Sequence, residues 1–259
     1  MIRSIFAPDQ TALLPYLTAG LPGPEHSVDL FSAMADAGAD AFEIGIPYSD
    51  PLMDGPVIQA ASSAALEAGT NLDRAMEVVE GVVSRTGVPT LAMTYANVVF
   101  RTGVDEFASR LASSGALGII IPDMPVEEAG PVMEAAAARG LGVVLFAAPT
   151  SSDERIAAAA ALDPVFVYGV AEMGVTGERT RSSGRAAELA KRVRAITDIP
   201  LVLGVGISTL EQAAAAGEVA DGVIVGSAIV RRVLEADSPE SAAAALHQAV
   251  TALRSALDE

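Results

Sequence analysis

Residues 41–56 of the chain read Ala41-Phe42-Glu43-Ile44-Gly45-Ile46-Pro47-Tyr48-Ser49-Asp50-Pro51-Leu52-Met53-Asp54-Gly55-Pro56. The first six residues form an apolar run of strand type with one acid, Glu43, in its middle. The loop that follows is dense in proline and glycine and carries Asp50 and Asp54. A buried strand has no use for a carboxylate, because an unpaired buried charge is costly. A local rule broken in this way points to a functional site, so we expect these acids to face a ligand.

On both sides of this stretch, strand-like apolar runs alternate with alanine-rich amphipathic segments, a pattern typical of a parallel sheet. The predicted strands are 13–18, 41–46, 89–95, 117–121, 142–146, 165–170, 201–203 and 222–225. The predicted helices are 25–37, 56–68, 72–85, 104–113, 126–139, 153–161, a helix that follows the glycine-rich loop 173–184 and ends at 196, 210–216, 228–236 and 241–257. Strands that are each followed by a helix predict an α/β fold of the (β/α)8 TIM-barrel class with extra helices. No proline-rich linker interrupts the alternation, so we expect residues 1–259 to form a single domain.

The composition excludes several classes of function. A formal net charge of −17 repels nucleic-acid phosphates and anionic lipid. The chain contains no cysteine, and its two histidines, His26 and His247, lie far apart, so we expect no metal site and no Ser-His-Asp triad. The N-terminal residues lack the apolar stretch of a signal peptide, and no run is long enough for a membrane span. We therefore expect a cytoplasmic protein that binds neither nucleic acid nor a membrane.

Polar residues fall at the carboxyl ends of the predicted strands or in the loops that follow, where barrels of this class carry their active sites. They are Glu43, Asp50, Asp54, Tyr95, Asn97, Asp123, Tyr168, Thr176 and Ser227.

Three glycine-containing loops follow the last predicted strands. Gly204-Val205-Gly206-Ile207-Ser208 and Val225-Gly226-Ser227-Ala228 come after the seventh and eighth strands, where barrels frequently bind phosphate through backbone N–H groups. One such loop alone would indicate only a tight turn, but two on adjacent strands favour a phosphate site. Gly174-Val175-Thr176-Gly177 is expected to be a mobile lid over the ligand, and the alternative is a disordered surface loop, which is compatible with a lid that orders on binding.

With these segments placed, the sequence resembles the tryptophan synthase α-subunit family over almost its whole length. The resemblance rests on residues 15–20, 42–56, 95–97, 123–128, 174–177, 204–208 and 226–230. It implies cleavage of indole-3-glycerol phosphate to indole and glyceraldehyde 3-phosphate, with indole passed to a β subunit in an αββα heterotetramer. It also implies no cofactor in this subunit, with pyridoxal phosphate only in the β subunit. The residues it implicates are Glu43 and Asp54 as catalytic acids, and Tyr168, Thr176, Gly177, Gly206, Gly226 and Ser227 as substrate-binding groups.

The sequence departs from the family's usual pattern at four places, one of which is the short segment before Pro15, where we expect the family's leading helix to be truncated. Ala171-Glu172-Met173 precedes the lid motif where a polar pair is common, and Val205 stands where many members have an aromatic residue. Leu21 replaces an aspartate that helps to hold the lid. These changes concern the lid and substrate packing rather than the reaction.

Two carboxylates suit a retro-aldol cleavage. Indole C3 must gain a proton and the adjacent glycerol hydroxyl must lose one, which a single acid with a pKa near neutrality can do. Glu43, in an apolar wall, is expected to have a raised pKa. Asp54, nearer to water, is expected to stay ionised and to accept a hydrogen bond from the indole N–H.

Other interpretations stay open at this point. Glu43 could be a structural acid bonded to backbone or to Tyr168, and Asp54 could only cap the next helix. A Schiff-base aldolase needs a lysine at a strand end, but Lys191, the only lysine, lies in a predicted surface helix. A metal-dependent aldolase lacks its histidines. A phosphosugar isomerase, another barrel of tryptophan biosynthesis, and a non-catalytic subunit that activates a partner remain as alternatives.

Overall fold

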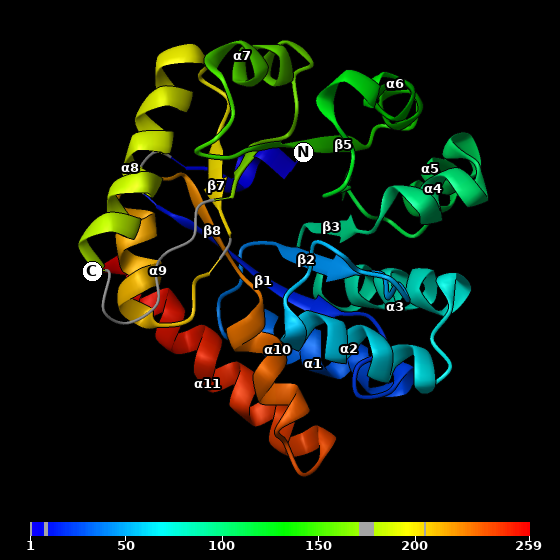
Figure 1. Ribbon diagram of the computed structural model, residues 1–259. Helices are drawn as coiled ribbons and strands as arrows, with labels where there is room; N and C mark the ends of the chain where they lie inside the picture. The colour runs from blue at the N-terminus through cyan, green and yellow to red at the C-terminus, as the bar shows by residue number, and fades with distance from the viewer. Residues whose placement is uncertain (1, 8–9, 171–178, 205) are drawn as a thin grey trace.

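Parallel strands close into a barrel in chain order, each pairing with the next and β8 pairing with β1 (Figure 1). The structure is a computed structural model that describes residues 2–7, 10–170, 179–204 and 206–259. In this part of the chain the barrel strands are β1 (Ala12–Thr18), β2 (Phe42–Gly45), β3 (Thr90–Met93), β4 (Gly118–Ile120), β5 (Gly142–Ala147), β6 (Val167–Gly169), β7 (Leu201–Leu203) and β8 (Gly222–Val225). The predicted (β/α)8 fold is therefore confirmed.

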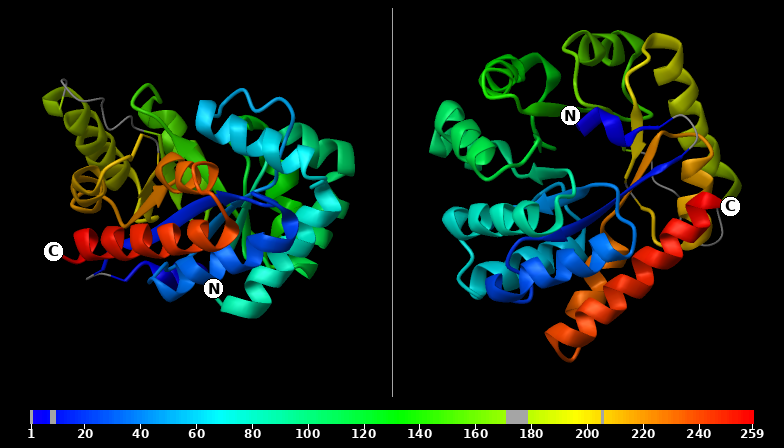
Figure 2. Two further views of the ribbon diagram at one scale, coloured as in Figure 1. Left: turned by 90° about the horizontal axis from the view of Figure 1, so that it is seen from below. Right: turned by 180° about the vertical axis from the view of Figure 1, so that it is seen from behind.

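Helices surround the barrel and cover the outer face of its strands (Figures 1 and 2). Every residue of β1 is buried, as expected for a parallel sheet packed on both faces. The helices are α1 (Pro24–Asp36), α2 (Pro56–Glu67), α3 (Leu72–Thr86), α4 (Ala96–Thr102), α5 (Val104–Ser113), α6 (Gly130–Ala137), α7 (Asp153–Ala161), α8 (Arg179–Ile196), α9 (Leu210–Gly217), α10 (Ser227–Leu234) and α11 (Pro239–Asp258), with the 3₁₀ turns η1 (Ile2–Ile5) and η2 (Val126–Glu128).

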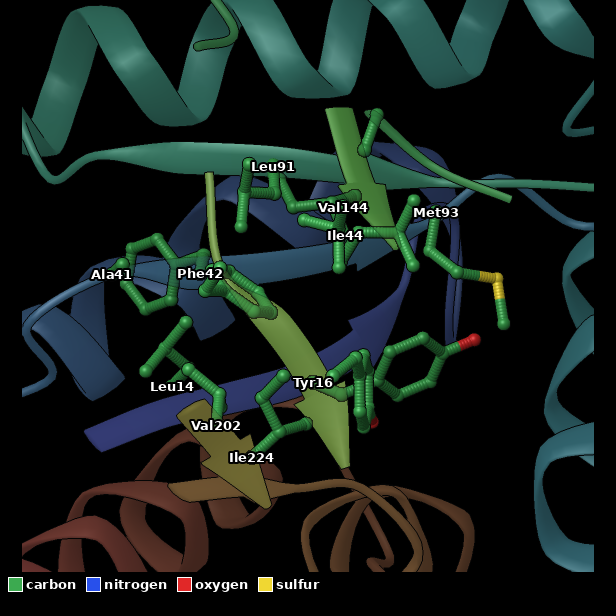
Figure 3. Close-up of a cluster of buried hydrophobic side chains, with 14 of the residues drawn as sticks. Leu14, Tyr16, Ala41, Phe42, Ile44, Leu91, Met93, Val144, Val202 and Ile224 are labelled. Atoms are coloured by element: carbon green, nitrogen blue, oxygen red, sulfur yellow. The ribbon is translucent and has the colours of Figure 1, made fainter. Parts of the chain in front are cut away.

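Apolar side chains from different strands meet in the core (Figure 3). Leu14, Leu91, Val144, Val202 and Ile224 come from five strands and are all buried. Such packing fills the barrel rather than leaving a pore, so a ligand can enter only from an end.

The N-terminal segment lies across the amino-terminal end of the barrel (Figure 2, right). The Arg3 guanidinium on η1 donates to the Val165 carbonyl at 3.2 Å and forms an ion pair of 2.7 Å with Asp163. The Phe6 ring packs edge-on against Phe166, with ring centroids 5.8 Å apart. These contacts cover the end of the barrel that is opposite the predicted site.

Two helical regions differ from the sequence-based prediction. The short helix α4 was not predicted, because only seven residues separate Tyr95 from Gly103, whose φ of 93° ends the helix. The single helix expected over 126–139 is instead η2 followed by α6. Pro131 lies in the first turn of α6, where its missing N–H is harmless, whereas it would break a helix that continued through it.

The glycine-rich loop expected over 173–184 is shorter than predicted, because α8 already begins at Arg179. Residues 180–184 therefore belong to the helix, and Gly184 does not mark its start. The lid motif itself lies outside the described residues.

The last helix is tied to the first strands at the amino-terminal end of the barrel. Asp40 accepts hydrogen bonds from the Leu13 N–H at 2.8 Å and from Arg254 Nη1 on α11 at 2.9 Å. Arg254 Nη1 also donates to the Thr11 carbonyl at 3.0 Å, and its side chain is only 13% exposed. Burial raises the pKa of Asp40, while the Leu13 N–H and Arg254 oppose this shift.

We expect Arg254→Met to lower the free energy of unfolding by about 2 kcal/mol, because it leaves a partly buried carboxylate without its cation. Arg74→Met is the matched control, since Arg74 and its partner Glu77 are 60% and 62% exposed and such pairs contribute less than about 1 kcal/mol. Urea unfolding followed by circular dichroism measures both. Equal losses in the two variants would contradict a special role for the Arg254 contact.

Candidate active site

Glu43 lies on β2 with its side chain buried and unpartnered. The residue is 3% exposed, and its Oε2 atom has no hydrogen-bond partner among the described residues. Burial raises the pKa of Glu43 to about 8, and the nearby charge of Asp54 adds to the shift. A carboxyl group with this pKa is protonated at neutral pH and can donate its proton. The structural alternative, an acid bonded to backbone or to Tyr168, finds no such bond here.

Asp54 lies on the loop between β2 and α2 and is half-buried. Burial raises its pKa to about 6, against the lowering effect of a hydrogen bond from the Tyr95 hydroxyl. Asp54 is therefore largely ionised at neutral pH. It does not cap α2, because the residue at the N-cap is Gly55 and no side chain provides a cap hydrogen bond. The capping alternative is therefore wrong.

The two acids lie where two cavities adjoin at the carboxyl ends of the strands. A smaller cavity of about 160 Å³ and a larger one of about 590 Å³ share five lining residues. The shared residues are Glu43, Met53, Asp54, Met93 and Tyr168. A ligand with two chemically different ends could thus place the bond between them beside both carboxyl groups.

The smaller cavity is suited to an anion. Gly206, Ser208, Gly226 and Ser227 line it, and no lysine or arginine occurs in its described lining. The helix α10 begins at Ser227, so its free N–H groups and dipole supply partial positive charge at the cavity. Gly206 has a φ of 77°, a conformation that favours glycine.

The larger cavity is mainly apolar and extends over the loops that follow β4 and β5. Its lining includes Ile120, Met124, Leu145 and Phe146, with Asp123, Ser151 and Arg155 among the polar groups. The Phe146 ring stacks on Tyr168 with centroids 5.0 Å apart and planes at 20°. A flat aromatic ligand fits such a surface.

Two glycines make room for two tyrosines that face the acids. A Cβ on Gly204 would lie 2.3 Å from the Tyr168 hydroxyl, and a Cβ on Gly45 would lie 2.1 Å from the Tyr16 hydroxyl. Both distances are far below van der Waals contact, so neither site accepts a side chain without displacing the ring. Tyr16 lines the smaller cavity but was missed in the sequence. Its place in the second half of a strand was the available signal.

The structure brings most of the sequence-predicted residues to one rim. Glu43, Asp54, Tyr168, Gly206, Gly226 and Ser227 all line the smaller cavity, whereas Thr176 and Gly177 lie outside the described residues. Lys191 is exposed on α8, away from the cavities, so a Schiff-base lysine is not available in the site.

The described residues lack two kinds of structural feature. They contain no group of three or more potential metal ligands among histidine, cysteine and carboxylate side chains. No helix formed by them combines the length and the apolar character needed to traverse a bilayer.

Comparison with known proteins points to one family. The family model described as tryptophan synthase alpha chain matches residues 3–258. The tryptophan synthase alpha chain of Picosynechococcus sp. is 42% identical over 256 residues, covering 98% of this chain and 97% of that protein. The one from Streptomyces coelicolor is 44% identical and covers 90% of this chain and 86% of the relative.

Solved structures agree. A chain of Mycobacterium tuberculosis tryptophan synthase superposes with a TM-score of 0.89 at 38% identity, covering 100% of this chain and 98% of that chain. The tryptophan synthase subunit alpha of Legionella pneumophila gives a TM-score of 0.89 at 33% identity, covering 99% and 96%.

We expect Glu43→Gln to stabilise the ligand-free protein at alkaline pH. The pKa of Glu43 is about 8 in the folded protein against an ordinary value of 4.5, so the folded state binds more protons than the unfolded state between these values. Stability therefore falls as pH rises through this window, and the amide removes that loss. The gain should be on the order of 4 to 5 kcal/mol at pH 8.5 and close to zero at pH 4.

Denaturant unfolding at several pH values measures this effect. Glu188→Gln, at an exposed position on α8, is the control and should leave the pH dependence unchanged. An unaltered pH dependence in Glu43→Gln would show that Glu43 is not a buried, unpartnered acid.

Proposed function

The chain belongs to the tryptophan synthase alpha chain family, and from this premise we propose that Glu43 and Asp54 carry out the family's cleavage of indole-3-glycerol phosphate. The products are indole and glyceraldehyde 3-phosphate, so the enzyme is a carbon–carbon lyase of tryptophan biosynthesis. The observation that supports the residue assignment is the Glu43 carboxyl group, which is buried and has an oxygen without a hydrogen-bond partner among the described residues, where an anion-compatible cavity adjoins an apolar one.

The two cavities match the two ends of this substrate. We assign the phosphate to the smaller cavity, where Gly206, Gly226, Ser227 and the N-terminus of α10 provide donors. We assign the indole ring to the apolar surface around Tyr168 and Phe146. Thr176 and Gly177, from the proposed lid, would complete the site over the bound substrate.

Glu43 is proposed to move the proton in both directions. It first protonates indole C3, which turns the ring into an electron-accepting indolenine. The glycerol hydroxyl on the adjacent carbon then gives up its proton to Glu43 as its carbonyl forms. The electrons of the broken C–C bond return to the ring and restore indole, so the reaction needs no further reactant. A pKa of about 8 keeps Glu43 protonated for the first step and basic enough for the second.

Asp54 is proposed to stabilise the charge that develops on the ring. Its pKa of about 6 leaves a carboxylate at neutral pH, which can accept a hydrogen bond from the indole N–H. Inside a cavity that excludes water, such a fixed charge is worth more than it is in solution.

The partner that fits this family is the tryptophan synthase β subunit, in an αββα heterotetramer that receives the indole. We propose that it docks on the rim formed by the β2–α2 loop and α4, where Leu52, Met53 and Phe100 are 90%, 64% and 50% exposed. We propose that this subunit needs no cofactor, that pyridoxal phosphate belongs to the β subunit, and that residues 1–259 work as a single (β/α)8 domain in the cytoplasm.

We expect Glu43→Gln to reduce the rate of indole release by roughly 10³-fold, since general acid–base catalysis contributes 10² to 10⁴. Asp54→Asn should reduce it by about 10²-fold, the effect of removing one electrostatic group from a preorganised site. Substrate affinity in calorimetry should change little in Glu43→Gln, because the phosphate contacts remain. Glu188→Gln is the control. Wild-type turnover in Glu43→Gln, or no indole release from the native chain, would refute the assignment.

For the partner surface, we expect Phe100→Ser to weaken binding of a tryptophan synthase β subunit by at least ~10-fold, since aromatic anchors dominate interfaces. Indole release by the isolated chain should not change, because Phe100 does not line either cavity. Leu234→Ser, at the last residue of α10, is a matched control with 38% exposure. Calorimetric titration measures the affinity of the native chain, Phe100→Ser and Leu234→Ser for the β subunit. Unchanged affinity in Phe100→Ser would place the partner elsewhere.

A further inference from the structure

The loop that carries Asp54 has few anchors of its own. The side chains of Leu52 and Met53 extend into solvent, with exposures of 90% and 64%. The backbone bonds of Leu52 N–H to Asp50 and of Asp54 N–H to Pro51 are internal to the loop. The Gln59 amide, at the start of α2, donates to the Asp54 carbonyl at 2.9 Å and to that of Pro51 at 3.4 Å. None of these contacts fixes the loop relative to a neighbouring strand.

Tyr95, which follows β3, connects this loop to a neighbouring strand. Its hydroxyl oxygen accepts a hydrogen bond from the Met53 N–H at 3.1 Å. Among the described residues, Tyr95 is the only residue outside 49–59 that forms a hydrogen bond with residues 50–54. The bond holds the backbone directly before Asp54.

A tyrosine hydroxyl that accepts one hydrogen bond keeps its own proton for another acceptor. The Asp54 carboxylate lies close enough to Tyr95 to be this acceptor, and their interaction lowers the pKa of Asp54 against the effect of burial. Burial and the charge of Asp54 raise the pKa of Tyr95 well above its ordinary value, so the hydroxyl stays protonated.

The Tyr95 ring is itself held in place. It is 4% exposed and stacks on Tyr48, with centroids 5.2 Å apart and planes at 29°. The Tyr48 hydroxyl accepts a hydrogen bond from the Asn97 amide at 3.0 Å. Next to Tyr95, the Ala96 N–H donates to Asp123 at 2.8 Å, which ties the start of α4 to the loop after β4. These contacts fix the position of the Tyr95 ring and therefore of its hydroxyl group.

We propose that Tyr95 is a positioning residue for the cleavage reaction: its hydroxyl holds the Met53 N–H and the Asp54 carboxylate together, and so fixes the acid at the junction of the two cavities. This inference rests on the proposed function only in so far as Asp54 acts in catalysis. The role differs from that of a merely structural tyrosine, because it acts on the protonation and orientation of one carboxylate.

Several other titratable groups face Asp54, and their titration also contributes to the pH profile of the reaction. Glu43 on β2, Tyr16 on β1 and Tyr168 on β6 all have pKa values that the charge of Asp54 raises. Asp123, after β4, faces Tyr95 and raises its pKa. A change measured at Asp54 alone is thus more informative than a change in the overall pH profile.

The test compares Tyr95→Phe with Tyr48→Phe in the full chain. Each variant loses one hydroxyl from the same ring stack, but the Tyr48 hydroxyl contacts Asn97 and not Asp54. Carbon-13 NMR of the aspartate carboxyl groups, with Asp54→Asn to assign the signal, gives the pKa of Asp54 without substrate. We expect a rise of about one unit in Tyr95→Phe, the scale of one lost hydrogen bond to the charged form, and no shift in Tyr48→Phe.

Kinetics supply the second readout. The acid limb of the pH profile of kcat/KM for indole release reports a pKa of the free enzyme. This pKa should rise by the same amount in Tyr95→Phe and stay unchanged in Tyr48→Phe. An Asp54 signal that titrates identically in native chain and Tyr95→Phe would overturn the proposal. If Asp54→Asn keeps full activity, the catalytic role of Asp54 fails, while the NMR result still decides whether Tyr95 holds the acid.

Discussion

The site depends on one costly arrangement: the Glu43 carboxyl group is buried in the apolar wall of a barrel, and its Oε2 atom has no hydrogen-bond partner in the part of the chain that the structure describes. In water Glu43 would be ionised at neutral pH, but burial raises its pKa to about 8. The same desolvation that weakens the ligand-free fold keeps the Glu43 carboxyl group protonated, so that it can donate a proton. Asp54 differs because it lies at the edge of the cavity, half-buried and in contact with a donor. Two similar side chains thus receive different protonation states from their surroundings.

The chain is strongly acidic, yet its smaller cavity is suited to an anion. With a net charge of −17, the protein gains no general attraction for a phosphorylated ligand. The smaller cavity instead presents glycine-rich loops, a serine hydroxyl and the first turn of α10. These are short-range, directional donors, so they can bind an anion at one place while the surface as a whole repels it.

The sequence predicts the barrel well and singles out Glu43 as a candidate, because both depend on local signals. Alternating strand and helix patterns give the topology, and Glu43 stands out as a charge in a run that should be apolar. The roles of Tyr16 and Tyr95 depend on which strands are neighbours and in what register, for example Tyr16 opposite Glu43. No local pattern contains that information. Two other differences have local causes. Gly103 ends the short helix α4, which was not predicted, and Pro131 requires α6 to start anew after η2. Both effects depend on where each helix starts, which the sequence pattern does not specify to the residue.

The two ends of the barrel show how a structural acid, Asp40, differs from Glu43, the acid that we propose to be catalytic. Asp40 and Glu43 both have pKa values raised by burial, so the shift alone does not identify a site. The Asp40 carboxylate accepts hydrogen bonds from the Leu13 N–H and from Arg254, both within 2.9 Å. These two bonds join α11 to β1. Glu43 is more deeply buried, yet residues 2–7, 10–170, 179–204 and 206–259 offer its Oε2 atom no such partner. A buried acid with no hydrogen-bond partner among the described residues needs an explanation, and a catalytic role is one, so this feature says more about function than the pKa does.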